Sequence, residues 1–307
     1  MPPTPAVRLA GVVKRFGDLT ALDHLDLEVA PGLCFGLLGP NGAGKSTLMS
    51  LLTGAAVATA GTVEVLGLPV PASARTARRR TGLVPQLDNL DGEITCRDNL
   101  EVYARLYGVP RAQRRQAITE SLELARLTEK AGNHVEELSG GMRRRLLIAR
   151  GLLHQPDLVL MDEPTVGLDP QIRQDLWQTI LDVRARGATI VLTTHYIEEA
   201  ERLCDEVAVI HRGRLLDLGS PAELIKRHVG TEIVVEIHGE AERRDRVAAL
   251  VSRHGLASRP AGTSVALFTD SVERLADIGV ASDDIRHRTR RPANLEDVFV
   301  TLTGDSL

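Results

Sequence analysis

The sequence predicts an α/β fold with a mainly parallel core sheet, an antiparallel N-terminal sheet, a helical insert and a small α+β C-terminal domain. The first observation is a short apolar segment that leads into a glycine-rich loop and then a helix, at 33–52. The second is a pair of apolar segments, 158–163 and 189–195, that end in polar residues, as strands do where parallel sheets bind ligands. The third is the alternation of strands and helices, which is typical of such sheets.

Composition limits the classes of protein that the chain can belong to. Its 307 residues fit one large domain with a small partner, and 43% hydrophobic with 25% charged residues is typical of globular proteins. A net charge of −4 gives no reason to expect binding to nucleic acid. Three widely spaced cysteines fit neither a zinc site nor a disulfide framework. No apolar run reaches the ~18 residues of a membrane span, so a role at a membrane would need another chain.

The first two strands are predicted at 7–16 and 22–29, where apolar and polar residues alternate. Phe16 lies at the turn between them. An aromatic ring at a strand end packs into a core more often than it binds a ligand, so the residues alone favour packing, with ligand stacking as the alternative. Another strand, 61–67, is bounded by glycines.

The glycine-rich loop at 39–47 fits the phosphate-binding pattern G-x-x-x-x-G-K-[ST]. Its residues are Gly39, Pro40, Asn41, Gly42, Ala43, Gly44, Lys45, Ser46 and Thr47. Glycines let the backbone approach phosphate oxygens, and the following helix presents its positive end to an anion. We therefore expect Lys45 to reach the β- and γ-phosphates of a nucleotide and the Ser46 hydroxyl to bind Mg²⁺.

The segment from 81 to 127 forms the predicted helical insert and its connection to the sheet. Residues 81–86 read as a short buried strand that ends at a proline, with the polar Gln86 just outside it. Thr95 and Asp98 form a capping-box pattern that opens one helix, and an amphipathic helix follows at about 113–127.

A helix start is predicted at Leu138-Ser139-Gly140-Gly141-Met142, before three arginines and an apolar helix through Leu153. Ser139 is a natural N-cap, and Gly140 and Gly141 would leave backbone N–H groups open to an anion. A simple capping turn is the alternative interpretation of this segment.

Two carboxylates, Asp162 and Glu163, emerge at the end of the apolar strand 158–163. Asp162 could hold Mg²⁺, directly or through a water, and Glu163 could accept a proton from an attacking water. His195 ends the strand 189–195, where it is either a capped imidazole or a sensor of the γ-phosphate. Between them, a turn at 167–170 leads into a helix at about 171–186, and a helix at 198–203 and a strand at 206–211 follow His195.

The sequence changes character near Gly230, which divides the chain into a large domain at 1–228, with the glycine-rich loop, and a C-terminal domain at 229–307. Strands are expected at 231–237, 265–268 and 285–291, and helices at 241–254, 271–278 and 294–303. We find no catalytic constellation in this small α+β domain.

Together these motifs resemble the ATP-binding subunits of ABC transporters over residues from about 7 to 228. The resemblance implies that 39–47 is the Walker A loop, which binds ATP, and that 158–163 is Walker B. It also implies that Gln86 contacts Mg²⁺ and the attacking water, that His195 is the switch histidine and that Phe16 stacks on adenine. The last implication reverses the interpretation from the residues alone.

Two further segments resemble parts of the same family. Residues 138–142 are similar to the signature motif, and 167–169, ending in Asp169, are similar to the D-loop. The signature commonly ends in Gln, whereas here it ends in Met142. Because Ser139 and both glycines are present, the resemblance still implies phosphate contact.

The subfamily is indicated by 36–41, by the signature and by Leu295-Glu296-Asp297-Val298-Phe299. These segments resemble ATPases that pair with type-2 exporter permeases, among them nodulation-factor (lipo-oligosaccharide) and daunorubicin-type multidrug export ATPases. The resemblance implies an ATPase that powers export of a lipo-oligosaccharide or a lipophilic drug. It also implies a separate integral membrane permease and a peripheral position at the cytoplasmic face of the cell membrane.

The physical logic of the site predicts two copies of the chain. One loop supplies charge to one side of the triphosphate, and the other side needs a second helix N-terminus. We therefore expect an ATP-sandwiched homodimer in which Ser139, Gly140, Gly141 and Asp169 of one copy act on the nucleotide of the other.

Two other classes of protein remain as alternatives. A soluble ABC ATPase that acts on ribosomes or DNA would usually carry two cassettes or a long coiled-coil insert, and the sequence has neither. A P-loop kinase or GTPase would not need the segment 138–142.

Overall fold

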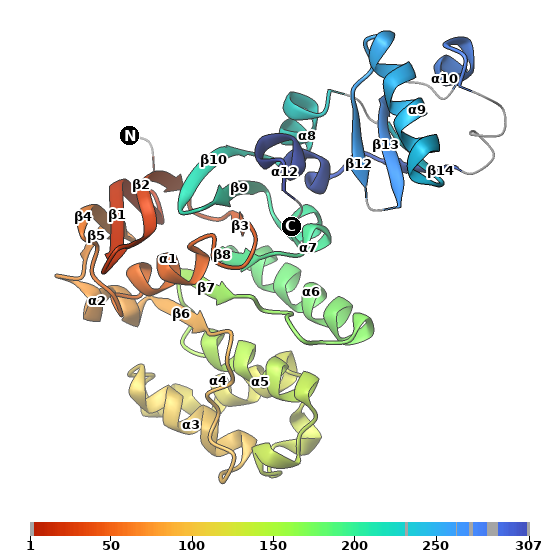
Figure 1. Ribbon diagram of the computed structural model, residues 1–307. Helices are drawn as coiled ribbons and strands as arrows, with labels where there is room; N and C mark the ends of the chain where they lie inside the picture. Colours follow the sequence, from red (N-terminus) through yellow and green to blue (C-terminus); the bar gives the residue numbers. More distant parts are fainter. Residues whose placement is uncertain (1–2, 231–232, 262, 270–272, 281–287, 306–307) are drawn as a thin grey trace. The chain divides into compact units, whose positions relative to one another are not determined.

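The computed structural model describes residues 3–230, 233–261, 263–269, 273–280 and 288–305 (Figure 1). Residue contacts divide the chain into two compact units, Met1–Leu218 and Gly219–Leu307. The sequence-based division at 228/229 lies later, because helix α8 (Pro221–His228) packs against α12 (Leu295–Thr303) in the second unit.

The core of the first unit is a six-stranded sheet. Across the sheet the strands are β10 (Arg214–Gly219), β9 (Glu206–His211), β3 (Cys34–Leu38), β8 (Thr189–Thr194), β7 (Leu158–Asp162) and β6 (Thr81–Val84). The strand β3 runs parallel to β8 and β9, and β7 runs parallel to β8 and β6. All residues of β3 and β8 are buried, which explains their continuous apolar and β-branched sequences.

The second sheet of this unit is antiparallel where its pairs are described. Its strands are, in order, β2 (Leu19–Val29), β1 (Val7–Phe16), β4 (Ala60–Val65) and β5 (Leu68–Val70). Alternating residues of β1 and β2 join the same apolar cluster as helix α1 (Lys45–Leu52) and the core strands β3 and β7. The two sheets therefore share one core with the helix that follows the glycine-rich loop.

The first unit also contains further helices and two 3₁₀ turns. The bounds are α2 (Ala74–Arg79), α3 (Cys96–Leu106), α4 (Arg111–Leu124), α5 (Gly140–Leu152), α6 (Pro170–Ala185) and α7 (Ile197–Leu203), with 3₁₀ turns at Thr128–Lys130 and Val135–Glu137. Figure 1 shows α3, α4 and α5 grouped together beside the core sheet. They have their own apolar cluster, to which Leu100, Leu122 and Leu146 contribute. The helices α3 and α4 are the predicted helical insert, and α5 is the helix predicted separately after Ser139.

The second unit contains a four-stranded sheet in the order β12-β13-β11-β14. Its elements are β11 (Ile233–His238), α9 (Ala241–Arg253), β12 (Ser258–Ala261), β13 (Ser264–Thr269), α10 (Glu273–Asp277) and β14 (Arg288–Pro292), followed by α12. All three strand pairs are antiparallel. Together with the order of elements, this is the split β-α-β arrangement of ferredoxin-like folds.

The predicted α/β fold class is confirmed, and the differences concern short elements. The strands β5, β10 and β12 and the helix α8 were not predicted, because β5 and β12 are very short and most residues of β10 and α8 are half-exposed or exposed. The helix predicted at 113–127 spans Arg111–Leu124 instead. Residues 231–232, 271–272 and 285–287 of three predicted C-terminal elements lie outside the described residues.

Candidate functional site

The glycine-rich loop joins β3 to α1 in a backbone path that only glycine can follow at two points. Gly42 and Gly44 have φ angles of 82° and 104°, in the left-handed region. At Gly44 a Cβ atom would also lie 2.6 Å from the carbonyl oxygen of Ala21. The loop therefore wraps closely around the start of α1, whose first N–H groups have no helical partner.

Lys45, the first residue of α1, is buried and points back across its own loop. Its Nζ donates hydrogen bonds to the carbonyl oxygens of Gly39 at 2.7 Å and Pro40 at 3.1 Å. The same nitrogen lies 3.4 Å from Oε1 of Glu163. Burial lowers the pKa of Lys45, and the nearby Glu163 carboxylate opposes this shift. The loop thus holds an ammonium group next to a carboxylate in a dehydrated place.

Glu163 is the meeting point of three strand ends. It follows β7 directly and is buried, with a φ of 45° that is uncommon for a residue other than glycine. Gln86, beyond the end of β6, donates from Nε2 to Glu163 Oε2 at 3.3 Å. Nδ1 of His195, at the end of β8, lies 3.4 Å from Oε1 without a hydrogen bond. The left-handed backbone of Glu163 is strained for a residue other than glycine, and strained residues cluster at functional sites.

Asp162 faces the first turn of α1. Its Oδ1 accepts hydrogen bonds from Ser46 Oγ at 3.4 Å and from Thr193 Oγ1 at 2.6 Å. Thr193 Oγ1 also accepts from the backbone N–H of Glu163 at 2.9 Å. One hydroxyl from β8 therefore fixes both acidic residues, Asp162 through its side chain and Glu163 through its backbone.

The other predicted site residues lie apart from this cluster. Ser139 and Asp169 accept hydrogen bonds from Met142 N and Ile172 N, and so cap α5 and α6. None of their described hydrogen bonds reaches the glycine-rich loop. The predicted N-cap at Ser139 is confirmed. Gly140 has open space where a Cβ would stand, whereas a Cβ at Gly141 would lie 2.6 Å from Ile172 on α6.

Phe16 does not pack into the core, so the interpretation from the residues alone was wrong. The side chain is 52% exposed, and Lys14 Nζ lies 4.6 Å from the ring centroid. An exposed aromatic face next to a cation leaves the ring available to a planar ligand, as the resemblance implies.

Sequence reasoning missed two residues that organise the site, Thr193 and Arg144. Thr193 stands in a polar run at the end of an apolar strand, which is a detectable signal. Arg144 is buried, and it donates hydrogen bonds to the backbone carbonyl oxygens of Gln86 and Glu163. In the sequence it is one of three consecutive arginines, and nothing in that run separates the buried one from its partly buried neighbours.

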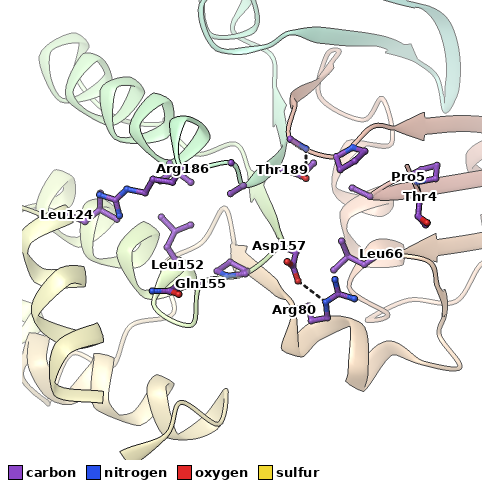
Figure 2. A pocket seen from close by; sticks show the side chains of 17 residues that line it. Thr4, Pro5, Leu66, Arg80, Leu124, Leu152, Gln155, Asp157, Arg186 and Thr189 are labelled. Atoms are coloured by element: carbon purple, nitrogen blue, oxygen red, sulfur yellow. Dashed lines mark hydrogen bonds and ion pairs between the residues drawn. The ribbon is translucent and has the colours of Figure 1, made fainter. Parts of the chain in front are cut away.

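A separate pocket of about 640 Å³ lies at the opposite edge of the core sheet, among residues that precede its parallel strands (Figure 2). Asp157 before β7 and Thr189 at the start of β8 line it, and Arg80 pairs with Asp157 at 2.7 Å. Ligands of open parallel sheets bind at the carboxyl ends of the strands, where Lys45 and Glu163 lie. We therefore expect a ligand at the glycine-rich loop rather than in this pocket.

The fold and the site define a P-loop ATPase built as an ABC cassette. The sequence model of the ABC transporter family matches residues 22–166. Nod factor export ATP-binding proteins I from Paraburkholderia xenovorans and Mesorhizobium japonicum are 46% and 47% identical, over 98% of this chain and 98% and 87% of theirs. The chain therefore belongs to the ABC transporter family of ATP-binding subunits, and it is an ATPase.

Solved structures agree with this assignment. The ATP-binding subunit of an ABC transporter has a TM-score of 0.67 and 28% identity, covering 73% of this chain and 93% of that one. An ATP-binding cassette in a dimeric post-hydrolysis state with ADP and phosphate has a TM-score of 0.63 and 26% identity, covering 70% and 98%. These relatives support a transporter subunit and give no support to a soluble ATPase on ribosomes or DNA.

No helix within the described ranges combines the length and the apolar character that crossing a membrane requires.

Proposed function

We propose that this chain drives export through a separate membrane permease, by binding and hydrolysing ATP between two copies of itself. The observation that carries this proposal is the position of Glu163. It lies beside Lys45, Gln86 and His195 at the carboxyl edge of the core sheet. A carboxylate so placed can accept a proton from a water that attacks the γ-phosphate.

In the proposed site the triphosphate lies in the glycine-rich loop. Lys45 would turn from the carbonyl oxygens of Gly39 and Pro40 to the β- and γ-phosphates, which are stronger acceptors for an ammonium group. Gln86 and His195 would orient the attacking water and the γ-phosphate on either side of Glu163. Phe16 would stack on the adenine ring.

The donor set around Asp162 fits Mg²⁺. Ser46 supplies a hydroxyl, Asp162 a carboxylate and Gln86 an amide oxygen, all of which are hard oxygen ligands. Mg²⁺ is usually bound by few protein groups together with waters and substrate phosphates. When bound, it neutralises the charge that develops on the phosphates, and these three residues would hold it.

The proposed dimer follows from the residues that the single chain leaves apart. Ser139, Gly140, Gly141 and Asp169 stand at the starts of α5 and α6, and the first N–H groups of a helix can bind an anion. Since their described bonds do not reach the loop of their own chain, we assign them to the nucleotide of the partner copy. A dimeric cassette with ADP and phosphate is known among similar structures.

The proposed permease contact is the surface formed by the segment after Gln86 and by α3. Leu87 and Leu106 are 80% and 72% exposed, and Val102 on α3 is also exposed. Large apolar side chains grouped on a surface mark interaction sites. This contact would hold the chain as a peripheral subunit at the cytoplasmic face of the membrane.

For the cargo, we propose a lipo-oligosaccharide. The support is the set of Nod factor export ATP-binding proteins I that are 44–47% identical to this chain over nearly all of its length. A lipophilic drug is the other outcome that the test must allow.

The test is co-purification of the chain with a permease encoded beside it, reconstitution into vesicles and measurement of ATPase activity with each cargo class. We expect a lipo-oligosaccharide to stimulate hydrolysis and to accumulate inside inverted vesicles. Stimulation by lipophilic drugs alone would contradict the proposed cargo, and hydrolysis without any permease association would contradict the proposed transport role.

A further inference from the structure

One buried arginine is hydrogen-bonded both to the backbone of the segment that carries Gln86 and to the backbone of the segment that carries Glu163. Arg144 on α5 is 8% exposed. Its guanidinium donates five hydrogen bonds, at 2.5 to 3.3 Å, and every acceptor is a backbone carbonyl oxygen. The acceptors are Pro85 and Gln86 on one side and Asp162, Glu163 and Pro164 on the other.

This arrangement uses a property that no other side chain has. A guanidinium offers five N–H donors in one rigid plane, so it can fix the spacing of two separate chain segments. Burial lowers the pKa of Arg144, which reflects the cost of removing a cation from water. A buried charge is a poor means of gaining stability compared with apolar packing. The geometry therefore points to positioning as the role of this residue.

The place of Arg144 on α5 connects the two halves of the proposed site. The same helix begins at Ser139, which we assign to the partner's nucleotide. Further along it, Arg150 donates to the carbonyl oxygen of Asn89 at 3.1 Å. The helix α5 thus holds the segment 85–89 at two points, on either side of the exposed Leu87.

We propose that Arg144 is a positioning residue for ATP hydrolysis. It holds Gln86 and Glu163 at the separation at which their side chains meet, and it links that separation to the position of Ser139. The inference rests on the proposed function, in which Glu163 and Gln86 act on the attacking water. The inference adds that Arg144 joins the backbones of Gln86 and Glu163 to α5, so that both residues would move with this helix.

The test compares Arg144→Lys with the control Arg145→Lys. Lysine keeps the charge but offers one point of donation, so we expect kcat to fall about 10- to 100-fold, as for a small misplacement of reacting groups. The KM for ATP and the affinity for ATP measured in EDTA should change less than about threefold, because the contacts of Lys45 are untouched. Arg145 is the neighbouring arginine and pairs with Asp175 at 3.8 Å, so its variant should retain wild-type kcat.

Two readouts separate positioning from a merely structural role. Amide hydrogen exchange at 86–91 should become about tenfold faster in Arg144→Lys, while α1 remains protected. The losses in kcat from Arg144→Lys and Gln86→Ala should not multiply in the double variant, because one acts through the other. Fully multiplicative losses, or a kcat of Arg144→Lys within about twofold of wild type, would overturn the proposal.

A second variant covers the case in which Arg144→Lys fails to fold. Arg144→Gln removes the buried charge and keeps two donors, so it should fold and show a kcat between those of wild type and Arg144→Lys. Wild-type turnover serves as the check on the proposed function itself. Hydrolysis of ATP by the wild-type chain but not by Glu163→Gln would support the proposed function. With that result, a normal kcat in both Arg144 variants would contradict only the inference about Arg144.

Discussion

At the scale of single residues, the site depends on side chains whose ordinary preferences are overridden. Glu163 is buried and has a left-handed backbone, and Lys45 is a buried cation held against it. Both conditions cost free energy in a folded chain. They persist because Thr193, Gln86 and Arg144 hold the surrounding backbone and side chains in place.

The first prediction concerns Glu163→Gln. Glutamine keeps the size of the side chain but cannot accept the proton, so kcat should fall by at least about 10²-fold. Binding of ATP should persist, because the loop and Lys45 are intact. Phosphate release and equilibrium binding of ATP measure the two quantities. Turnover close to wild type would refute the assignment of Glu163.

Lys45→Ala is the matched comparison for that experiment. Loss of a charge-assisted contact to phosphate should weaken ATP binding by about tenfold or more. The two variants therefore separate binding from chemistry, and equal effects of both on ATP affinity would contradict the division of roles.

At the scale of elements, the helix α12 explains the motif Leu295-Glu296-Asp297-Val298-Phe299. Asp297 is fully buried and accepts hydrogen bonds from Arg291 and Arg259. Its side chain also accepts from the backbone N–H of Asn294, which completes a capping box. Burial alone would raise the pKa of Asp297, but the bonds from Arg291, Asn294 and Arg259 outweigh it and lower the pKa. The acidic position of the motif is therefore an ion-pair centre.

The second prediction is that Asp297→Asn destabilises the second unit by about 3 kcal/mol, because two partly buried arginines lose the fully buried carboxylate that they share. Amide hydrogen exchange in β11 and β13 of the full-length chain measures the loss. Glu296→Gln, at the adjacent and less buried position, is the control and should leave exchange in both strands unchanged. Equal protection of β11 and β13 in Asp297→Asn and wild type would contradict the role of this ion pair.

The same network makes the second unit sensitive to acid. Because the pKa of Asp297 is lowered on folding, its stabilisation is present above the ordinary pKa of 3.8 and is lost as pH falls through the folded value. Wild type should lose this contribution below about pH 4, whereas Asp297→Asn should show a flatter dependence of stability on pH. Parallel pH profiles for the two proteins would contradict this assignment.

At the scale of the whole molecule, one chain holds only half of the contacts that the proposed site needs. The loop at 39–47 and the cluster around Glu163 come from the core sheet. In the proposed dimer, the N-termini of α5 and α6 would supply the other half to the nucleotide of a second copy. Catalysis is therefore expected to depend on assembly.

The third prediction tests this dependence. In the Glu163→Gln background, ATP with Mg²⁺ should double the mass measured by light scattering. Adding Gly140→Asp should abolish the doubling, because a carboxylate at the start of α5 would face the partner's triphosphate. Space is open at this position, so the chain should fold and bind ATP normally. Gly140→Asn, similar in size but neutral, is the control, and equal loss of dimer in both variants would contradict the electrostatic explanation.

Local sequence patterns account for a large share of the fold and for the principal site residues. The glycine-rich loop, the paired acids after an apolar strand and the serine before two glycines each encode their own conformation, through φ preference, strand periodicity and helix capping. The fold class and the meeting of Lys45 with Glu163 follow from these local signals, because parallel strands bring their carboxyl ends to one edge.

The sequence by itself therefore predicted the residues to which we assign the chemistry, and the structure places Lys45, Gln86, Glu163 and His195 together at one edge of a parallel sheet. Only the tertiary structure decided that Phe16 is exposed, that Thr193 fixes both acids, and that Arg144 is the one of three adjacent arginines that reaches the backbone of Gln86 and Glu163. The physical reason is that burial and hydrogen-bond partners are set by segments distant in the chain. A run of like residues carries no local signal of which one those segments will enclose.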